Sequence, residues 1–310
     1  TGGACVCRGR GGGAADVEVV GELDASLDED GVHDLQLRVV GEGVPRDVAG
    51  IDGVPHNRHR RGVWAVQPES RWAIEEEVEF VETAGFSPKA FLPRIKDAGM
   101  KVIHKCTTLR HAQSAAKAGV DAITILGAEA GGHPGMNMIG GLVQGAVVPD
   151  GLDIPVVLAG GVGTGRQLLA ALALGTDGIL LGSRMTVAEE IWADDKYKQR
   201  VAETVESDTR IVMSTFNDNS RVLDNAAAKA VNELEQQGVK DFEQYKPLVQ
   251  GPNQREAYAS GNFDQGTLSM GQSCTFANEI VSVEKIFDDI SLKVREQYEE
   301  NPYPRWVKLG

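Results

Sequence analysis

The sequence lacks the features that mark membrane proteins and nucleic-acid-binding proteins. No apolar run approaches the roughly 18 residues of a membrane-spanning helix, and Thr1–Gly13 has neither the basic start nor the apolar stretch of a signal peptide. Acidic residues outnumber basic ones by 45 to 31, for a net charge of −14, whereas phosphate-binding surfaces rely on clustered Lys and Arg. We therefore expect a soluble protein with neither a membrane nor a nucleic acid as partner.

Cysteine is also scarce. The four cysteines are Cys5, Cys7, Cys106 and Cys274, and only the first two lie close together in the sequence. This spacing matches neither the cysteine pattern of a zinc ribbon nor that of a disulfide framework. The sequence thus predicts no metal site and a reducing, cytoplasmic location.

Residues 1–70 form an atypical segment. They contain no Lys, Phe or Tyr but 13 of the 37 glycines. The short apolar runs Val17–Val20 and Leu35–Val40 are candidate strands, although no convincing helix follows them. The basic run Asn57–Arg61 is either a phosphate- or RNA-binding element or, as we prefer, a solvated charge cluster. We interpret the segment as disordered or foreign to the fold.

From Trp72 onward, strand-like and helix-like runs alternate, with a glycine after each helix. The strands are continuously apolar, as parallel strands buried on both faces require. The expected strands are Val78–Thr83, Lys101–His104, Ala122–Leu126, Ile154–Ala159 and Gly178–Gly182, and the helices between them are Pro88–Ala98, Leu109–Ala118 and Gly165–Leu174. A long Gly-rich loop is expected after Leu126. Residues 71–190 therefore predict part of a β/α barrel.

Residues 191–310 are predicted to be a mostly helical region that packs on the barrel. Apolar residues recur there at three- and four-residue spacing over Tyr197–Glu206, Ala226–Gln237 and Val283–Tyr298. Arg210 and Arg221 are expected to hold this region against the barrel in preference to contacting substrate.

The first stretch with a chemical signature is Gly127–Gly135, of sequence GAEAGGHPG, which directly follows an expected strand. Active sites of β/α barrels lie in such loops. Gly131 and Gly132 would let the backbone approach a ligand closely, and His133 carries the side chain best suited to proton abstraction near neutral pH. The alternative is a turn with a structural histidine; the context favours a catalytic base.

The second stretch consists of two glycine turns. Pro155–Gly161 (PVVLAGG) runs on into an expected helix, and Ile179–Arg184 (ILLGSR) ends the next strand. Glycine turns at helix starts present backbone N–H groups to an anion, and the last two loops of such barrels often bind phosphate. Two plain tight turns are the alternative; their order along the chain favours a phosphate site.

Together these motifs resemble the nitronate monooxygenase family, over Ile74–Ile290. The resemblance rests on VETAG (Val81–Gly85), KVIHKCTTLRHA (Lys101–Ala112), GAEAGGHPG, PVVLAGG, ILLGSR, DTRIVM (Asp208–Met213), RVLDNA (Arg221–Ala226) and SMGQSCTFANEI (Ser269–Ile280). It implies an FMN-binding (β/α)8 TIM barrel with a smaller helical domain, which oxidises alkyl nitronates with oxygen to a carbonyl compound and nitrite. It further implies that His133 is the catalytic base and that Gly131, Gly132, Gly160, Gly161, Gly182 and Ser183 surround the FMN.

The chain also departs from this family. Nothing in residues 1–70 matches the first three barrel strands, so the recognisable strands correspond to the fourth through eighth. Five strands cannot close a barrel, and an unpaired edge invites aggregation. In addition, Leu126 stands where many relatives carry a polar residue near the flavin. The phosphate end of the predicted site is therefore better supported than the ring end.

Two other functions remain open. One is an FMN-dependent enoyl-thioester reductase that uses NAD(P)H, whose barrel carries a similar Glu-x-Gly-Gly-His loop. The other is a non-catalytic, truncated barrel that binds no FMN. For either enzyme the partners are a small-molecule substrate and, for the monooxygenase, oxygen; a homo-oligomer is also allowed.

Several other residues invite a chemical role. His104 and His111 flank Cys106, but one is expected on a strand and the other in a helix, so neither a metal site nor a cysteine nucleophile is predicted. Arg184 could face a phosphate or an acidic neighbour, and Met136 and Met138 could line the substrate mouth or merely fill their loop.

Overall fold

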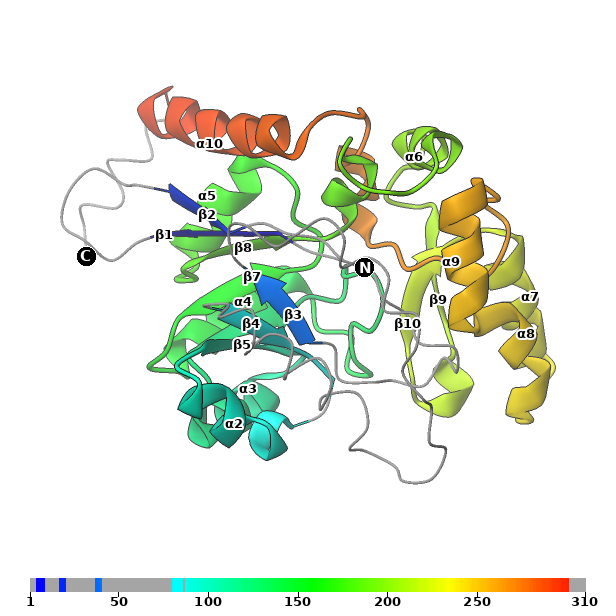
Figure 1. Cartoon of the computed structure of the whole chain (residues 1–310), viewed down its shortest axis with the longest axis horizontal. Coiled ribbons are helices and arrows are strands. Elements are labelled where there is room, and N and C mark those ends of the chain that lie inside the picture. Colours follow the sequence, from blue (N-terminus) through cyan, green and yellow to red (C-terminus); the bar gives the residue numbers. More distant parts are fainter. Residues whose placement is uncertain (1–3, 9–16, 21–36, 41–79, 86, 301–310) are drawn as a thin grey trace.

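The computed structural model describes residues 4–8, 17–20, 37–40, 80–85 and 87–300. Its centre is one sheet in the order β2-β1-β8-β7-β6-β5-β4-β3 (Figure 1). The strands are β1 (Ala4–Arg8), β2 (Val17–Val20), β3 (Leu37–Val40), β4 (Phe80–Thr83), β5 (Lys101–Cys106), β6 (Ala122–Leu126), β7 (Val156–Ala159) and β8 (Gly178–Leu181).

The five strands β4 to β8 are parallel and follow one another in chain order. Between them lie α2 (Leu92–Asp97), α3 (Leu109–Ala118), α4 (Gly141–Asp150) and α5 (Gly165–Ala173), with a 3₁₀ turn at Pro88–Ala90. The predicted α/β barrel-type fold is confirmed, and the helix at Leu109–Ala118 and the strand at Ala122–Leu126 have the predicted bounds.

The expectation of one long loop after Leu126 is wrong, because α4 forms within it. This helix contains Gly145 and Pro149 and shows no polar face, so it gave no helical signal. Gly145 packs closely instead: a Cβ there would lie 3.1 Å from Leu174 Cδ1 and 3.3 Å from Leu158 Cδ2. Tight contact with β7 therefore explains why this helix contains a glycine, although a glycine in the sequence predicts a loop.

The edge strands come from the atypical N-terminal segment. β1 pairs antiparallel with β8 and β2, and β3 pairs antiparallel with β4. Both apolar runs of the segment thus form strands, the second only from Leu37. In a (β/α)8 barrel all strands are parallel, so these three do not replace the missing barrel strands. The basic run Asn57–Arg61 and most of residues 1–70 lie outside the described residues.

The largest core lies between the sheet and its helices. Val81, Val102 and Ile123 are fully buried there and pack with residues of α2, α3 and α5. The C-terminal helix α10 (Val283–Glu300) lies along α5 (Figure 1) and adds Ile286 and Phe287 to this core. The packing of α10 thus stabilises the barrel portion.

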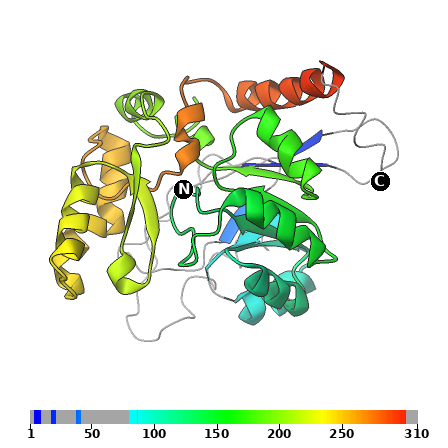
Figure 2. The same ribbon diagram turned by 180° about the vertical axis from the view of Figure 1, so that it is seen from behind.

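The region after β8 is less helical than expected, because it includes an antiparallel hairpin of β9 (Thr209–Val212) and β10 (Ser220–Leu223). Its short strands left little periodic signal. The hairpin lies between the barrel sheet and a group of helices in both views (Figures 1 and 2). The remaining helices are α6 (Asp195–Ala202), α7 (Ala226–Gln236), α8 (Lys246–Val249) and α9 (Gly251–Ser260), with 3₁₀ turns at Ser183–Val187, Ser214–Phe216, Phe242–Gln244 and Gln272–Phe276.

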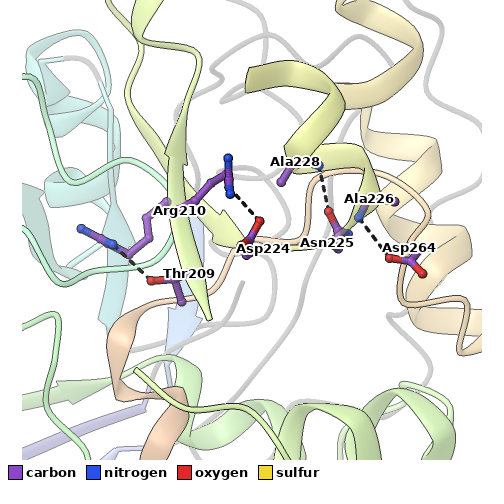
Figure 3. Close-up of polar contacts among 8 residues, drawn as sticks. Thr209, Arg210, Asp224, Asn225, Ala226, Ala228 and Asp264 are labelled. Carbon is purple, nitrogen blue, oxygen red and sulfur yellow. Dashed lines mark hydrogen bonds and ion pairs between the residues drawn. The ribbon is translucent and has the colours of Figure 1, made fainter. Parts of the chain in front are cut away.

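Polar contacts fix the hairpin to the start of α7 (Figure 3). Asn225 Oδ1 accepts a hydrogen bond from the Ala228 N–H at 2.9 Å, and Asp264 Oδ1 accepts one from the Ala226 N–H at 3.0 Å, so two free N–H groups of the helix are capped. Arg210 Nε donates to Asp224 Oδ1 at 2.7 Å. Arg210 therefore links the two strands of the hairpin. The prediction that Arg210 holds the helical region against the barrel is wrong.

Within the described ranges, no helix has the length and apolarity to cross a membrane. In the same part of the chain, no group of three or more His, Cys, Asp or Glu side chains is placed to hold a metal ion.

Candidate active site

The three motifs predicted to form the site leave the same edge of the sheet. Residues 127–135 follow β6, Gly160 and Gly161 follow β7, and Gly182 and Ser183 follow β8. Because β6, β7 and β8 are parallel neighbours, their carboxyl ends lie side by side, which is where barrel enzymes build their active sites.

Gly160 and Gly161 pack against the loop that follows β6. Both have left-handed backbone conformations, with φ of +89° and +75°. A Cβ at Gly160 would lie 3.0 Å from Ala130 N, and one at Gly161 would lie 2.8 Å from Glu129 Cβ. Positive φ and loop packing together require glycine at both positions.

Gly131 meets a segment to which the sequence analysis assigned no role. A Cβ at Gly131 would lie 2.5 Å from Gly271 N. The N–H of Gly271 donates to Ser183 Oγ at 2.7 Å, and the N–H of Gln272 donates to Glu129 O at 2.9 Å. Residues 270–272 thus bring the loops after β6 and β8 together, and the glycine in SMGQS was the available signal.

Gly132 connects the barrel to the hairpin. Its N–H donates to Arg221 O at 3.0 Å, and its carbonyl accepts from the Arg221 N–H at 2.6 Å. The Arg221 guanidinium donates from Nε and Nη2 to Ala128 O at 3.1 and 3.0 Å, and burial lowers its pKa while Glu129 opposes that shift. Arg221 therefore holds the helical region against the barrel, as predicted.

The turns after β7 and β8 retain free donors. Within the described chain, the N–H groups of Gly161, Gly182 and Ser183 donate to no acceptor, and a Cβ at Gly182 would meet no described atom within 4 Å. The helix α5 begins just beyond Gly161, capped by Thr164, whose Oγ1 accepts from the Gln167 N–H at 3.3 Å. Free N–H groups beside a helix start attract anions, so these residues fit the phosphate of a cofactor such as FMN.

A polar cluster on the inner face of the sheet also escaped the sequence analysis. Side chains alternate between the faces of a strand, so Glu82 and Lys105 lie opposite the core-facing Val81 and His104. Lys105 Nζ lies 3.0 Å from Glu82 Oε2, and both side chains are largely buried. Glu82 Oε1 and the adjacent Thr124 Oγ1 are buried and have no hydrogen-bond partner among the described residues, which is costly unless a ligand satisfies them.

Next to this cluster the inner face is apolar. Leu126, Val157, Ala159 and Leu180 pack together there, and Ala159 pairs with both Leu126 and Leu180 across the strands. The face thus combines buried charged groups on β4 and β5 with an apolar surface on β6 to β8. A flat ligand with one polar edge and one apolar edge, such as a flavin ring, fits this division.

His133 is exposed on the rim of the site. Its Nε2 lies 3.7 Å from Asp218 Oδ1, and the two side chains are 49% and 28% exposed. Asp218 belongs to the turn of the β9–β10 hairpin, and no signal in the sequence linked it to His133. In the loop that carries His133, Met136 is exposed and Met138 has a left-handed backbone with a φ of +47°. The imidazole is therefore accessible to a substrate and has a carboxylate beside it.

Of the side chains rejected as ligands or nucleophiles, His104 and Cys106 are buried on the helix side of the sheet, whereas His111 is exposed on α3. His104 Nδ1 is hydrogen-bonded to Thr83 Oγ1 at 2.8 Å, and burial lowers its pKa to about 4. Burial raises the pKa of Cys106 to about 12, and a thiol at that pKa is a poor nucleophile. Arg184 is buried. Burial lowers its pKa, and the nearby Asp289 and Glu279 oppose this shift. Of the two predicted surroundings of Arg184, a phosphate or an acidic neighbour, the structure therefore shows the acidic neighbour.

The chain is similar in sequence and fold to several known proteins. The chain is 29% identical over 210 residues to a protein from Staphylococcus saprophyticus named "Probable nitronate monooxygenase", which covers 64% of this chain and 59% of that protein. A protein of the same name from Staphylococcus aureus is 29% identical over 161 residues, or 49% of this chain and 45% of the relative. The chain spans about half the length of these curated relatives.

Two solved structures share the fold. FabK from Thermotoga maritima matches with a TM-score of 0.69 and 28% identity, over 74% of this chain and 72% of that one. A nitroalkane oxidase from Streptomyces ansochromogenes matches with a TM-score of 0.61 and 24% identity, over 75% and 68%. The family model described as "Nitronate monooxygenase" matches residues 65–292. This match covers well over half of the sequence, and the chain therefore belongs to the nitronate monooxygenase family.

Proposed function

We propose that this chain is an FMN-dependent oxidoreductase that oxidises alkyl nitronates and nitroalkanes with oxygen, giving a carbonyl compound and nitrite. The observation that carries the proposal is an accessible imidazole, His133, at the edge of the sheet where the N–H groups of Gly182 and Ser183 have no acceptor among the described residues. The membership of the family supports both the flavin and the class of substrate.

The phosphate of FMN would be held by the turns after β7 and β8. Gly161, Gly182 and Ser183 supply backbone N–H groups, while Gly131, Gly132 and Gly160 keep the surrounding loops close enough to form the turn. The ring would face the inner side of the sheet, where Lys105 and Glu82 offer polar contacts. When bound, the flavin supplies the redox chemistry by taking electrons from the substrate and passing them to oxygen.

The residues of the chain would do the proton chemistry. A neutral nitroalkane must lose a proton from Cα, and in this proposal the exposed imidazole of His133 would accept it. Leu126, Ala159 and Leu180 form an apolar surface, which suits oxygen and a small nitro compound better than a charged substrate.

A second candidate is an FMN-dependent enoyl-thioester reductase. The loop from Glu129 to His133 (EAGGH) favours it, because that barrel class carries a similar loop. A reductase would have to accept a reduced nicotinamide. Anaerobic addition of NAD(P)H would bleach the bound flavin of a reductase but leave that of a nitronate monooxygenase oxidised, so one titration separates the two.

The first test is whether the chain binds flavin through the proposed turn. The purified protein should absorb near 450 nm, whereas a non-catalytic barrel would be colourless. Gly182→Val should lose the flavin with little loss of stability, because its Cβ would meet no described atom within 4 Å and the backbone φ is −109°. Gly238→Val is the control, since its Cβ is also unobstructed but its φ of +72° is the more strained. Equal flavin retention by both variants would refute the phosphate site.

The second test addresses the base. His133→Asn should lower turnover of neutral nitroalkanes by about 10²–10⁴, the usual contribution of a positioned general base. Pre-formed nitronates have already lost the Cα proton, so their oxidation should change far less. Equal losses on both substrates would indicate a flavin or folding defect and remove His133 from the base role.

A further inference from the structure

We infer that the outer face of α4 is the surface through which two copies of this chain pair about a two-fold axis. The two α4 helices lie antiparallel in this arrangement, with an apolar stripe at the centre and ion pairs at both ends. The pairing involves neither flavin nor substrate and therefore goes beyond the proposed function.

The residues of α4 are distributed in the opposite way to those of an ordinary surface helix. The buried face consists of Gly141, Gln144, Gly145 and Val148. The exposed face consists of Leu142, Val143, Ala146, Val147 and Asp150. A surface helix normally buries its larger apolar side chains and exposes its polar ones. Here Leu142, Val143 and Val147 are 72%, 55% and 48% exposed, so the outer face has the composition of a contact surface.

Exposed apolar side chains are concentrated on this helix. Among the described residues, large apolar side chains are exposed at seven positions, and three of these lie within six consecutive residues of α4. Single exposed apolar residues are ordinary, whereas a contiguous patch marks an interaction surface. The helix lies beside α3, and Gly145 packs against Leu174 at the end of α5. The patch is thus the middle of a layer formed by α3, α4 and α5.

The charges around the patch differ in sign from those of the whole chain. The chain has a net charge of −14, but the exposed charged side chains of α3, α4 and α5 are Arg110, Lys117, Arg166 and Asp150. Within the described part of the chain, none of these four side chains forms an ion pair. A surface with a basic rim and one acidic group is able to complement a second copy of itself.

A two-fold axis through the middle of α4 brings these charges together. The helices α3, α4 and α5 run in the same direction, because each connects one parallel strand to the next. Arg110 and Arg166 lie in the first turns of α3 and α5, whereas Asp150 is the last residue of α4. With Ala146 at the axis, Asp150 therefore comes beside the partner's Arg110 and the partner's Arg166. Both ends make the same contact, as a two-fold interface requires.

The position of Asp150 is unfavourable in a single chain. It lies at the carboxyl end of α4, where the helix dipole repels a carboxylate, and the last turn holds no basic residue. In the pair, the guanidinium groups of the other copy offset this repulsion. Ion pairs at the rim of an interface mainly fix its orientation, while burial of the apolar stripe supplies the favourable free energy.

Sedimentation of the full chain as purified tests the pairing, and the wild type should form a dimer. Val147→Glu places a carboxylate in the apolar centre of the interface and should raise the dissociation constant by more than about 100-fold. Val205→Glu is the matched control, because Val205 is 45% exposed but lies outside the layer of α3, α4 and α5; this variant should remain a dimer. Circular dichroism would verify that both variants are folded.

Two outcomes of this experiment would overturn the inference. A wild type that stays monomeric at the highest soluble concentration would show that something other than a second copy covers α4. A dimer that is equally stable in Val147→Glu and Val205→Glu would show that the copies pair through another surface.

A mixing experiment tests whether the charges meet across the two copies. Asp150→Arg places like charges together at both ends and should weaken the dimer by about 10-fold or more. The double variant Arg110→Asp with Arg166→Asp should weaken it similarly. An equimolar mixture of the two proteins should dimerise as the wild type does, because basic groups face acidic ones at both ends of the mixed dimer. A mixture that associates no better than its components would refute the antiparallel arrangement.

Discussion

The two faces of β4 and β5 carry polar residues of opposite character. On the helix side, Thr83 and His104 are buried and hydrogen-bonded to each other at 2.8 Å. On the inner side, Glu82 and Lys105 form an ion pair at 3.0 Å, and Glu82 Oε1 has no hydrogen-bond partner in the described part of the chain. Residues that are adjacent in the sequence thus differ in their hydrogen bonding. Thr83 and His104 are paired with each other, whereas the charged Glu82 keeps one carboxylate oxygen without a partner among the described residues.

This difference separates structural polar groups from functional ones. A core tolerates polar side chains when they are neutral and paired, as on the helix side. Buried charges with unused hydrogen-bonding capacity cost stability and persist where a ligand uses them. This comparison supports our proposal that the ligand binds on the inner face, and it predicts different responses to substitution on the two sides.

The largest effect is expected on the inner face. Lys105→Met leaves the Glu82 carboxylate buried without its cation, and breaking a buried pair in this way costs about 3–5 kcal/mol. Urea unfolding of the flavin-free protein would measure the loss. The double variant Glu82→Gln with Lys105→Met removes both charges and should recover most of the stability. A loss below about 1 kcal/mol in the single variant would show that the pair is solvated.

On the helix side, His104 should make the folded chain sensitive to acid. Its pKa is lowered by burial to about 4 from an ordinary value of 6.5. Below pH 6.5 the unfolded chain binds a proton that the folded chain does not, so this contribution to stability is complete at pH 7 and falls as the pH drops toward 4. The loss reaches up to about 3 kcal/mol.

The measurement for His104 is urea unfolding at several pH values between 7 and 4.5. His104→Gln keeps a hydrogen-bonding group beside Thr83 but does not titrate in this range. Its stability should therefore depend less on pH than that of the wild type. Identical pH dependence in the two proteins would show that His104 titrates alike in the folded and unfolded chains.

The smallest effect concerns Cys106, on the same side as His104. Burial raises the pKa of this thiol to about 12, so almost no reactive thiolate exists at neutral pH. The native protein and Cys106→Ser should therefore react with the same number of equivalents of a thiol reagent. In urea the variant should react with one equivalent fewer. A difference already present in the native proteins would contradict burial of the thiol.

Local signals in the sequence predicted the helix-facing side well. The helix α3 begins after Thr108, whose Oγ1 accepts from the His111 N–H at 3.2 Å, and ends at Gly119 with a φ of +103°. Both signals are contained within the helix and its neighbours, so they can be read from the sequence. The helix α4 was missed because its glycine and proline positions make sense only against β7 and its neighbours.

The sequence by itself determined the order of strands and helices in the barrel portion apart from α4, the glycine turns after β7 and β8, and the resemblance to the family. These follow from periodicity, capping and motifs, which act over a few residues. Only the tertiary structure decided that Gly131 meets Gly271, that Glu82 and Lys105 share the inner face, and that Asp218 faces His133. Such contacts depend on strand register and on the bridge at Arg221, which join residues far apart in the chain and leave no local pattern.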